Sequence, residues 1–112
     1  MPKKYRNTSV KAKNGIFDSK KELMRWKMLQ HLEQEGEIKM LRRQVKFELI
    51  PHQKIDNRVV ERACYYVADF TYMIDDRIFV EDVKSEITRK NPEYIIKRKL
   101  MLFRYGIRVK EV

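Results

Sequence analysis

The chain has 112 residues, which is enough for one modest hydrophobic core and too few for two domains. Its formal net charge is +10, and a field of this sign attracts polyanions, nucleic acid before anionic membranes. One cysteine excludes a disulfide within the chain and suits a reducing cytoplasm, and no apolar run approaches the roughly 20 residues that span a bilayer. We therefore expect a cytoplasmic protein with a nucleic-acid partner and no membrane association.

Residues 1–15 are expected to form an exposed basic arm, and residues 16–112 a single domain. The arm residues expected to bind nucleic acid are Lys3, Lys4, Arg6, Lys11 and Lys13. Ser19 followed by Glu22 matches the S-x-x-E capping box that opens helices. Apolar residues then recur at helical spacing to about Glu35, and Gly36 is a natural stop. The sequence thus predicts a first helix over residues 19–35.

The middle of the chain is rich in strand formers. Residues 38–50 alternate apolar and charged side chains and end at Pro51. Residues 52–58 are expected to be a loop or a hairpin turn, followed by a long strand over residues 59–74. Asp75 and Asp76 form the next turn, and residues 77–84 the next strand.

Asn91 and Pro92 predict the start of a second helix, which ends at Gly106. Lys97 and Arg98 lie on this helix, either as part of a solvated face or as ligands of nucleic-acid phosphates. Residues 107–112 are expected to close the chain as a short strand. The order is helix, three strands, helix, strand, which predicts an α/β or α+β fold with helices on a small mixed sheet.

Two acids interrupt apolar strands, and the turn at residues 75–76 brings them together. Counting back from a two-residue or four-residue turn places Asp69 opposite Asp82, whereas a three-residue turn would not. Opposed residues of an antiparallel pair point to the same face. Because side chains alternate along a strand, Lys84 shares that face. Glu81 is expected on the other face, in a structural or solvent-exposed position.

Two carboxylates directly opposed repel one another, so we expect a cationic partner. Lys84 is one candidate, and a divalent ion that prefers oxygen ligands, Mg²⁺ or Mn²⁺, is the other. Such a site in a basic protein suits phosphodiester hydrolysis. The plainer interpretation is a pair of aspartates on a wet sheet face, bridged by Lys84 and nearby arginines.

The arrangement D-x12-D-V-K on consecutive strands resembles the PD-(D/E)XK nuclease superfamily, and the element order is similar to its αβββαβ, restriction-endonuclease-like core. Ala68-Asp69 stands where proline-aspartate is usual. The segments FDSKKE, QVKFELIP, ADF and VEDVKS look like those of small phage-encoded nucleases, of transposase nuclease domains and of Holliday-junction resolvases.

This resemblance implies a metal-dependent DNA endonuclease, active on branched or junction DNA in phage DNA metabolism or recombination, located in the host cytoplasm. Asp69 and Asp82 would bind Mg²⁺ with the Val83 carbonyl, and Glu22 would contact a metal or its water. Lys84 would serve the attacking water or the scissile phosphate, and Gln44 would lie near the site. A homodimer and a phage protein partner are further expectations.

Two alternatives stay open. Glu22 would also be explained by helix capping alone, through a bond to the Ser19 backbone. The chain as a whole could be a nucleic-acid-binding module without catalysis, either a degenerate nuclease fold or a fold like the double-stranded-RNA-binding domain, whose order α-β-β-β-α matches the early elements. Such a domain needs neither opposed carboxylates nor a closing strand over residues 107–112.

Overall fold

The computed structural model describes residues 10–12 and 15–112. Four residues of the predicted nucleic-acid-binding arm, Lys3, Lys4, Arg6 and Lys13, lie outside the described residues. Lys11 belongs to a short strand, β1 (Val10–Ala12), which pairs antiparallel with β2 (Gly15–Phe17). Regular structure therefore begins within the segment that we expected to be an exposed arm.

The remaining elements follow the predicted order with two additions, β4–β5 and α2. They are α1 (Lys20–Gln34), β3 (Lys39–Ile50), β4 (Gln53–Ile55), β5 (Arg58–Glu61), β6 (Cys64–Ile74), β7 (Arg77–Asp82), α2 (Glu86–Arg89), α3 (Pro92–Tyr105) and β8 (Lys110–Glu111). The predicted long strand over residues 59–74 is thus two strands, β5 and β6. The predicted loop or hairpin turn over residues 52–58 contains β4, the turn at residues 56–57 and the first residue of β5.

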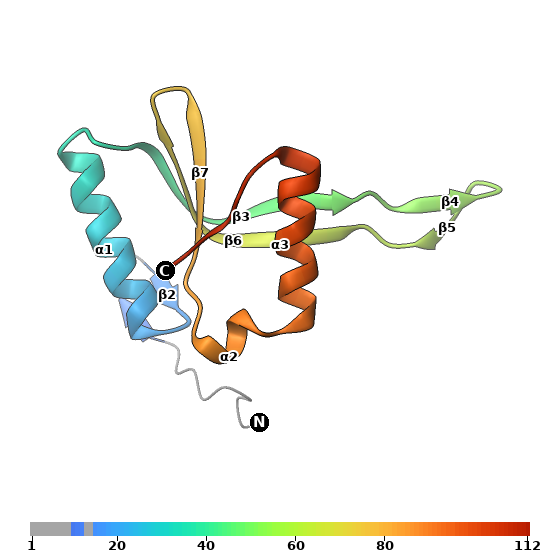
Figure 1. The fold of residues 1–112 in the computed structure, drawn as a ribbon, viewed down its shortest axis with the longest axis horizontal. Helices are drawn as coiled ribbons and strands as arrows, with labels where there is room; N and C mark the ends of the chain where they lie inside the picture. Colours follow the sequence, from blue (N-terminus) through green and yellow to red (C-terminus); the bar gives the residue numbers. More distant parts are fainter. Residues whose placement is uncertain (1–9, 13–14) are drawn as a thin grey trace.

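A mixed sheet of four strands in the order β3-β6-β7-β8 organises the molecule. β6 pairs antiparallel with β3 and β7, while β8 returns from α3 and pairs parallel with β7. Figure 1 shows α1 and α3 on either side of β7. The α+β fold and the closing strand are therefore confirmed.

Two hydrophobic clusters form the core, and β6 contributes to both. In the N-terminal half of β6, Tyr66 and Ala68 pack with Tyr94 and Met101 of α3. In its C-terminal half, Phe70 and Tyr72 pack with Leu29 of α1. Asp69 lies between the two halves, at the point where β6 passes from one cluster to the other. Burial on both flanks fixes the backbone that presents this acid.

Local sequence explains both long helices. Ser19 caps α1, with its hydroxyl accepting the Glu22 N–H at 3.1 Å. The Asn91 side chain accepts from the Tyr94 N–H at 3.2 Å, Pro92 opens α3, and Gly106 ends it with φ of +67°. None of the helices in the described residues is long and apolar enough to cross a membrane.

Candidate functional site

The β6–β7 hairpin has the predicted register. Ile74 pairs with Arg77 and Tyr72 with Phe79, and the ladder ends at Phe70 and Glu81. One step further along the same count lie Asp69 and Asp82. Beyond this point the Val83 N–H donates to the side chain of Asp69, at 2.8 Å from Oδ2, in place of a backbone carbonyl of β6. The two aspartates therefore meet where the sheet opens.

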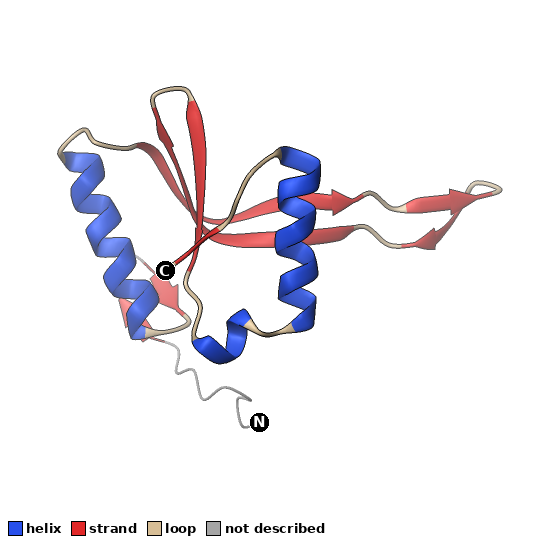
Figure 2. Cartoon of the chain, viewed as in Figure 1, coloured by secondary structure: helices blue, strands red, loops and turns tan. Residues whose placement is uncertain are grey.

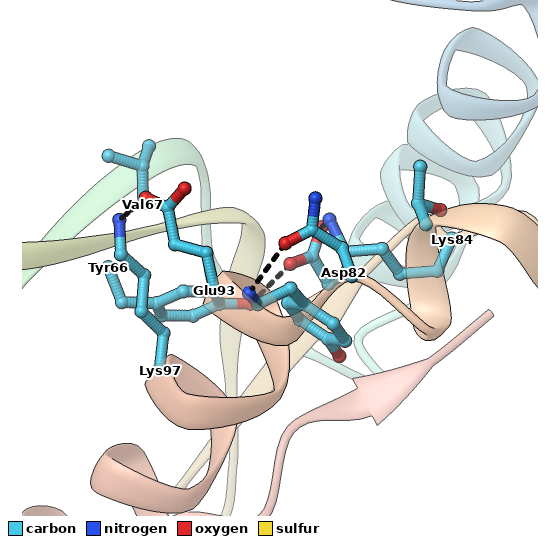
Figure 3. Close-up of a pocket in the computed structure, with 9 residues that line it drawn as sticks. Tyr66, Val67, Asp82, Lys84, Glu93 and Lys97 are labelled. Atoms are coloured by element: carbon cyan, nitrogen blue, oxygen red, sulfur yellow. Dashed lines mark hydrogen bonds and ion pairs between the residues drawn. The ribbon is translucent and has the colours of Figure 1, made fainter. Parts of the chain in front are cut away.

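Asp82 is almost fully buried, at 2% exposure, and its two oxygens have different partners. Oδ1 lies 3.1 Å from the Lys84 Nζ, and Oδ2 accepts the Tyr66 hydroxyl at 2.6 Å. The Lys84 ammonium also lies 4.6 Å from the centre of the Tyr94 ring. These residues line a cavity of about 310 Å³, and Figure 3 shows Tyr66, Asp82 and Lys84 around it. The predicted association of Asp82 with Lys84 is thus present.

Glu22 extends from the first turn of α1 toward the strands and is 2% exposed. Only half of the expected capping box forms, since the Glu22 carboxylate accepts the N–H of Asp18, at 3.2 Å, rather than that of Ser19. Its other oxygen, Oε1, accepts from Gln44 Nε2 at 3.2 Å and lies 3.8 Å from Arg43. Capping alone therefore does not account for the position of Glu22.

Gln44 connects two of the acids. Its Nε2 donates to Glu22 Oε1 and, at 3.3 Å, to Asp69 Oδ1. Gln44 has φ of +52° in the middle of β3, a left-handed conformation that is uncommon for any residue except glycine. No sequence pattern reveals this backbone, so the residue was indicated only by the family resemblance. The structure places it against the acids.

The negative charges of Glu22 and Asp69, the two acids nearest α1, are only partly compensated by neighbouring groups. Burial raises the pKa of Asp69 to about 7, with the neighbouring Asp82 contributing and the Val83 N–H and Lys84 opposing. Burial also raises the pKa of Glu22, and the charge of Asp69 adds to the effect. Both face a cavity of about 220 Å³ that Val83 and Lys84 also line. This cavity is a place where a cation would be stabilised.

Metal binding depends on how the carboxylates of the site are grouped. Among residues 10–12 and 15–112, no three His, Cys, Asp or Glu side chains form a cluster that could hold a metal as they stand. The acids instead form two adjacent pairs, Glu22 with Asp69 through Gln44, and Asp69 with Asp82 across the strands. Carboxylate oxygens fit Mg²⁺ or Mn²⁺ in kind. The described side chains thus supply ligands of a suitable kind without being gathered around one point.

Other predicted residues have mixed placements. Lys97 lines the 310 Å³ cavity and lies 3.2 Å from Glu93, while Arg98 lies 3.3 Å from Glu111. Tyr66 is 3% exposed and its hydroxyl donates to Asp82, so its ring does not offer a surface for stacking on a base. Its alternation with other buried β6 residues predicts burial, but nothing in the sequence reveals its hydroxyl partner.

Glu81 is buried, not exposed to solvent. It lies on the face opposite Asp82, as predicted, but it is 0% exposed, so the solvent-exposed alternative is wrong. Arg25 of α1 holds it with two hydrogen bonds, each 2.7 Å long, and the Tyr72 hydroxyl donates to the same carboxylate. This ion pair ties α1 to β7 directly behind the site.

The comparisons with known proteins give a family and nothing more specific. One family model, described as "Protein of unknown function (DUF1064)", matches residues 2–111. No curated protein and no solved structure matches the chain.

Proposed function

We propose that this chain, a member of the DUF1064 family, is a metal-dependent DNA endonuclease that hydrolyses phosphodiester bonds. The observation that carries the proposal is the convergence of Asp69, Asp82 and Lys84 at the opening of the sheet. Glu22 and Gln44 extend the same cluster from α1 and β3. Acids with raised pKa values, crowded beside a lysine and a cavity, are typical of catalytic sites.

Each residue has a role in this proposal. Asp69, Asp82, Glu22 and the Val83 carbonyl would hold Mg²⁺ or Mn²⁺, which supplies charge stabilisation and an acidified water. Lys84, fixed by Asp82 at 3.1 Å and by the Tyr94 ring, presents a cation where a scissile phosphate would enter the cavity. Tyr66 fixes the orientation of Asp82. Gln44 holds the carboxylates of Glu22 and Asp69 toward one another.

The proposed substrate is DNA, because the net charge of +10 supplies a field that attracts a polyanion. The family resemblance stated from the sequence adds branched or junction DNA as the preferred substrate. It also adds phage DNA metabolism as the setting, and a homodimer or a phage protein as the partner. Lys97 would contact phosphate from the α3 side of the cavity, with Arg98 and the basic residues before residue 14 assisting.

Cleavage of labelled linear, branched and four-way-junction DNA tests the proposal, with Mg²⁺, Mn²⁺ or EDTA present. Wild type is compared with Asp82→Asn and Lys84→Ala, and with Lys46→Ala, an exposed-strand control whose ammonium lies over Tyr65. We expect metal-dependent products from wild type and the control, and none from the two site variants, which still bind DNA. Wild-type cleavage by either site variant would show that the site is wrong.

A binding module without catalysis is the second candidate, favoured by the lack of a closed metal cluster in the part of the chain that the structure describes. Tight, salt-sensitive DNA binding with no cleavage under any metal would support it. Its version like a double-stranded-RNA-binding domain is disfavoured by β8, which pairs with β7 as the fourth strand of the sheet.

A further inference from the structure

The most prominent unexplained feature is a hairpin that we call the β-arm, residues 51–63. It continues β3 and β6 beyond the sheet and projects away from both helices, as Figures 1 and 2 show. In the described structure, β4 and β5 pair only with each other. Every residue of the two strands is exposed. The β-arm therefore adds nothing to either hydrophobic cluster.

Folding stability does not explain the composition of the β-arm. An isolated two-stranded hairpin is only marginally stable in water. Three of its β-branched side chains are nevertheless open to solvent, Ile55 at 64%, Val59 at 52% and Val60 at 51%. Asp56 and Asn57 both adopt positive φ, as in the tight turns that suit the twist of a hairpin. The β-arm is thus a well-formed ribbon that presents its side chains outward.

The side chains of the β-arm have the chemistry of a DNA-groove reader. Lys54, Arg58 and Arg62 are exposed, and none of them forms an ion pair with an acid of the described residues. Asp56, Asn57 and Arg58 at the tip are side-chain types that hydrogen-bond cytosine, adenine and guanine edges, respectively. Exposed isoleucine and valine suit the thymine methyl group. The major groove admits a two-stranded ribbon of this kind.

The reach of the β-arm also matches a duplex. From Gln44 in the site to Lys54 near the tip the chain advances ten residues, eight of them in β3 and β4, which in extended conformation span roughly 33 Å. One helical turn of B-DNA is about 34 Å. The tip would therefore meet the same side of the duplex as the site does, one turn away.

We propose that the β-arm lies in the major groove of duplex DNA, about one helical turn from the phosphate at Asp82 and Lys84. The inference rests on the proposed function in that both share DNA as the partner. It does not require cleavage, so the two can fail separately.

Two variants test it. In the first, Asn-Gly replaces residues 51–63 and joins Ile50 to Cys64, which already pair. In the second, Lys54, Arg58 and Arg62 become glutamine and the ribbon is kept. A matched control changes three exposed cations far from the β-arm, Lys27, Lys39 and Arg77, to glutamine. Thermal unfolding checks that each variant folds, and the charge variant keeps the test valid if the shortened chain does not.

Affinity for duplex DNA is measured by fluorescence anisotropy in EDTA, so that no cleavage is needed. We expect both β-arm variants to raise the Kd at least about tenfold and to lower the slope of log K against log salt by about 2 to 3, while the control loses less than about threefold. Wild-type affinity should rise as the duplex is lengthened past one helical turn, and that of the shortened variant should not.

Groove choice is tested with duplexes whose cytosines carry glucosylated hydroxymethyl groups, which fill the major groove. We expect these groups to raise the Kd of wild type for the duplex and to leave the Kd of the shortened variant unchanged. Equal weakening of both, or an unchanged Kd in both β-arm variants, would overturn the proposal. So would light scattering that shows the shortened variant as a monomer and wild type as a dimer, because the β-arm would then bind a second copy. Arm-dependent binding by a wild type that never cleaves would support the β-arm and refute the nuclease.

Discussion

Gln44 and Asp69 face each other across β3 and β6, and the amide of Gln44 donates to the carboxylate of Asp69 at 3.3 Å. The pairs on either side, Arg43 with Phe70 and Val45 with Ala68, keep the register of the two strands. Between them Gln44 adopts φ of +52°, a conformation that costs a non-glycine residue on the order of 1 kcal/mol. The chain bears this strain at a position where the side chain reaches both Asp69 and Glu22.

Gln44→Gly is expected to separate stability from activity. Glycine adopts positive φ without strain, but the variant also loses the hydrogen bonds to Glu22 and Asp69, so the two effects should offset to within about 1 kcal/mol of unfolding free energy. Cleavage should fall by about 10–100-fold, because Glu22 and Asp69 lose the group that orients them. Met40→Gly is the matched control, since Met40 has φ of +55°, is 60% exposed and lies outside the acid cluster. Denaturant unfolding and cleavage rates are measured on both variants. An unchanged cleavage rate for Gln44→Gly would show that Gln44 does not orient Glu22 and Asp69.

Tyr66→Phe should weaken the site through Asp82. The hydroxyl donates to Asp82 Oδ2 at 2.6 Å, and its removal leaves a buried oxygen without that partner, at a cost of about 1–2 kcal/mol in unfolding free energy. We expect cleavage to fall about tenfold and the Mn²⁺ concentration for half-maximal cleavage to rise. Tyr65→Phe is the control, because it removes a hydroxyl from the neighbouring residue and keeps the ring over which the Lys46 ammonium lies. Equal behaviour of the two variants would show that Tyr66 only fills space.

The sequence predicted the hairpin register because a single turn determines it. Asp75 and Asp76 separate the two strands by two residues, and period-two alternation then fixes every pair back to Asp69 and Asp82. The same alternation predicts that Lys84 lies on the face of Asp82. Helix bounds were also close, since Ser19, Asn91 and Gly106 are local capping choices that need no tertiary information.

What the sequence could not reveal depends on tertiary contacts or on exposure. Glu22 fits a capping box equally well with or without a site, and only its contact with Gln44 distinguishes the two. The sequence predicts the β-arm partly as a loop and partly as a strand, because all of its strand residues are exposed and so show no pattern of burial. The charged partner of the buried Glu81 is Arg25, fifty-six residues earlier in the chain, which no local spacing indicates.

Arg25→Ala is expected to destabilise the protein by about 3–5 kcal/mol. Burial favours the neutral form of Glu81, but the hydrogen bonds from Arg25 and Tyr72 outweigh it and lower the pKa of Glu81 below its ordinary value. Removing the arginine therefore leaves a buried charge without its main partner. Replacing Arg25, Glu81 and Tyr72 together by Met, Leu and Phe should recover stability to within about 1 kcal/mol of wild type.

Urea unfolding measures both changes. Lys97→Ala, which breaks the surface pair with Glu93, serves as the control and should cost less than about 0.5 kcal/mol. A loss of less than about 1 kcal/mol for Arg25→Ala would show that Glu81 finds water or another partner, and that the pair does not fix α1 against β7.

Asp69→Asn is expected to stabilise the protein in EDTA, and only at high pH. Burial and the neighbouring Asp82 raise the pKa of Asp69 to about 7, well above the 3.8 of an ordinary aspartate. The folded chain thus keeps a proton that the unfolded chain has lost, and stability falls as pH rises from about 4 to about 7. Asparagine is neutral throughout, so the variant should gain up to about 4 kcal/mol over wild type at pH 8 and nothing at pH 4. Thermal unfolding across this range, with Asp75→Asn at the exposed turn as control, measures the difference; a gain that does not change with pH would show that Asp69 carries no excess charge in the fold.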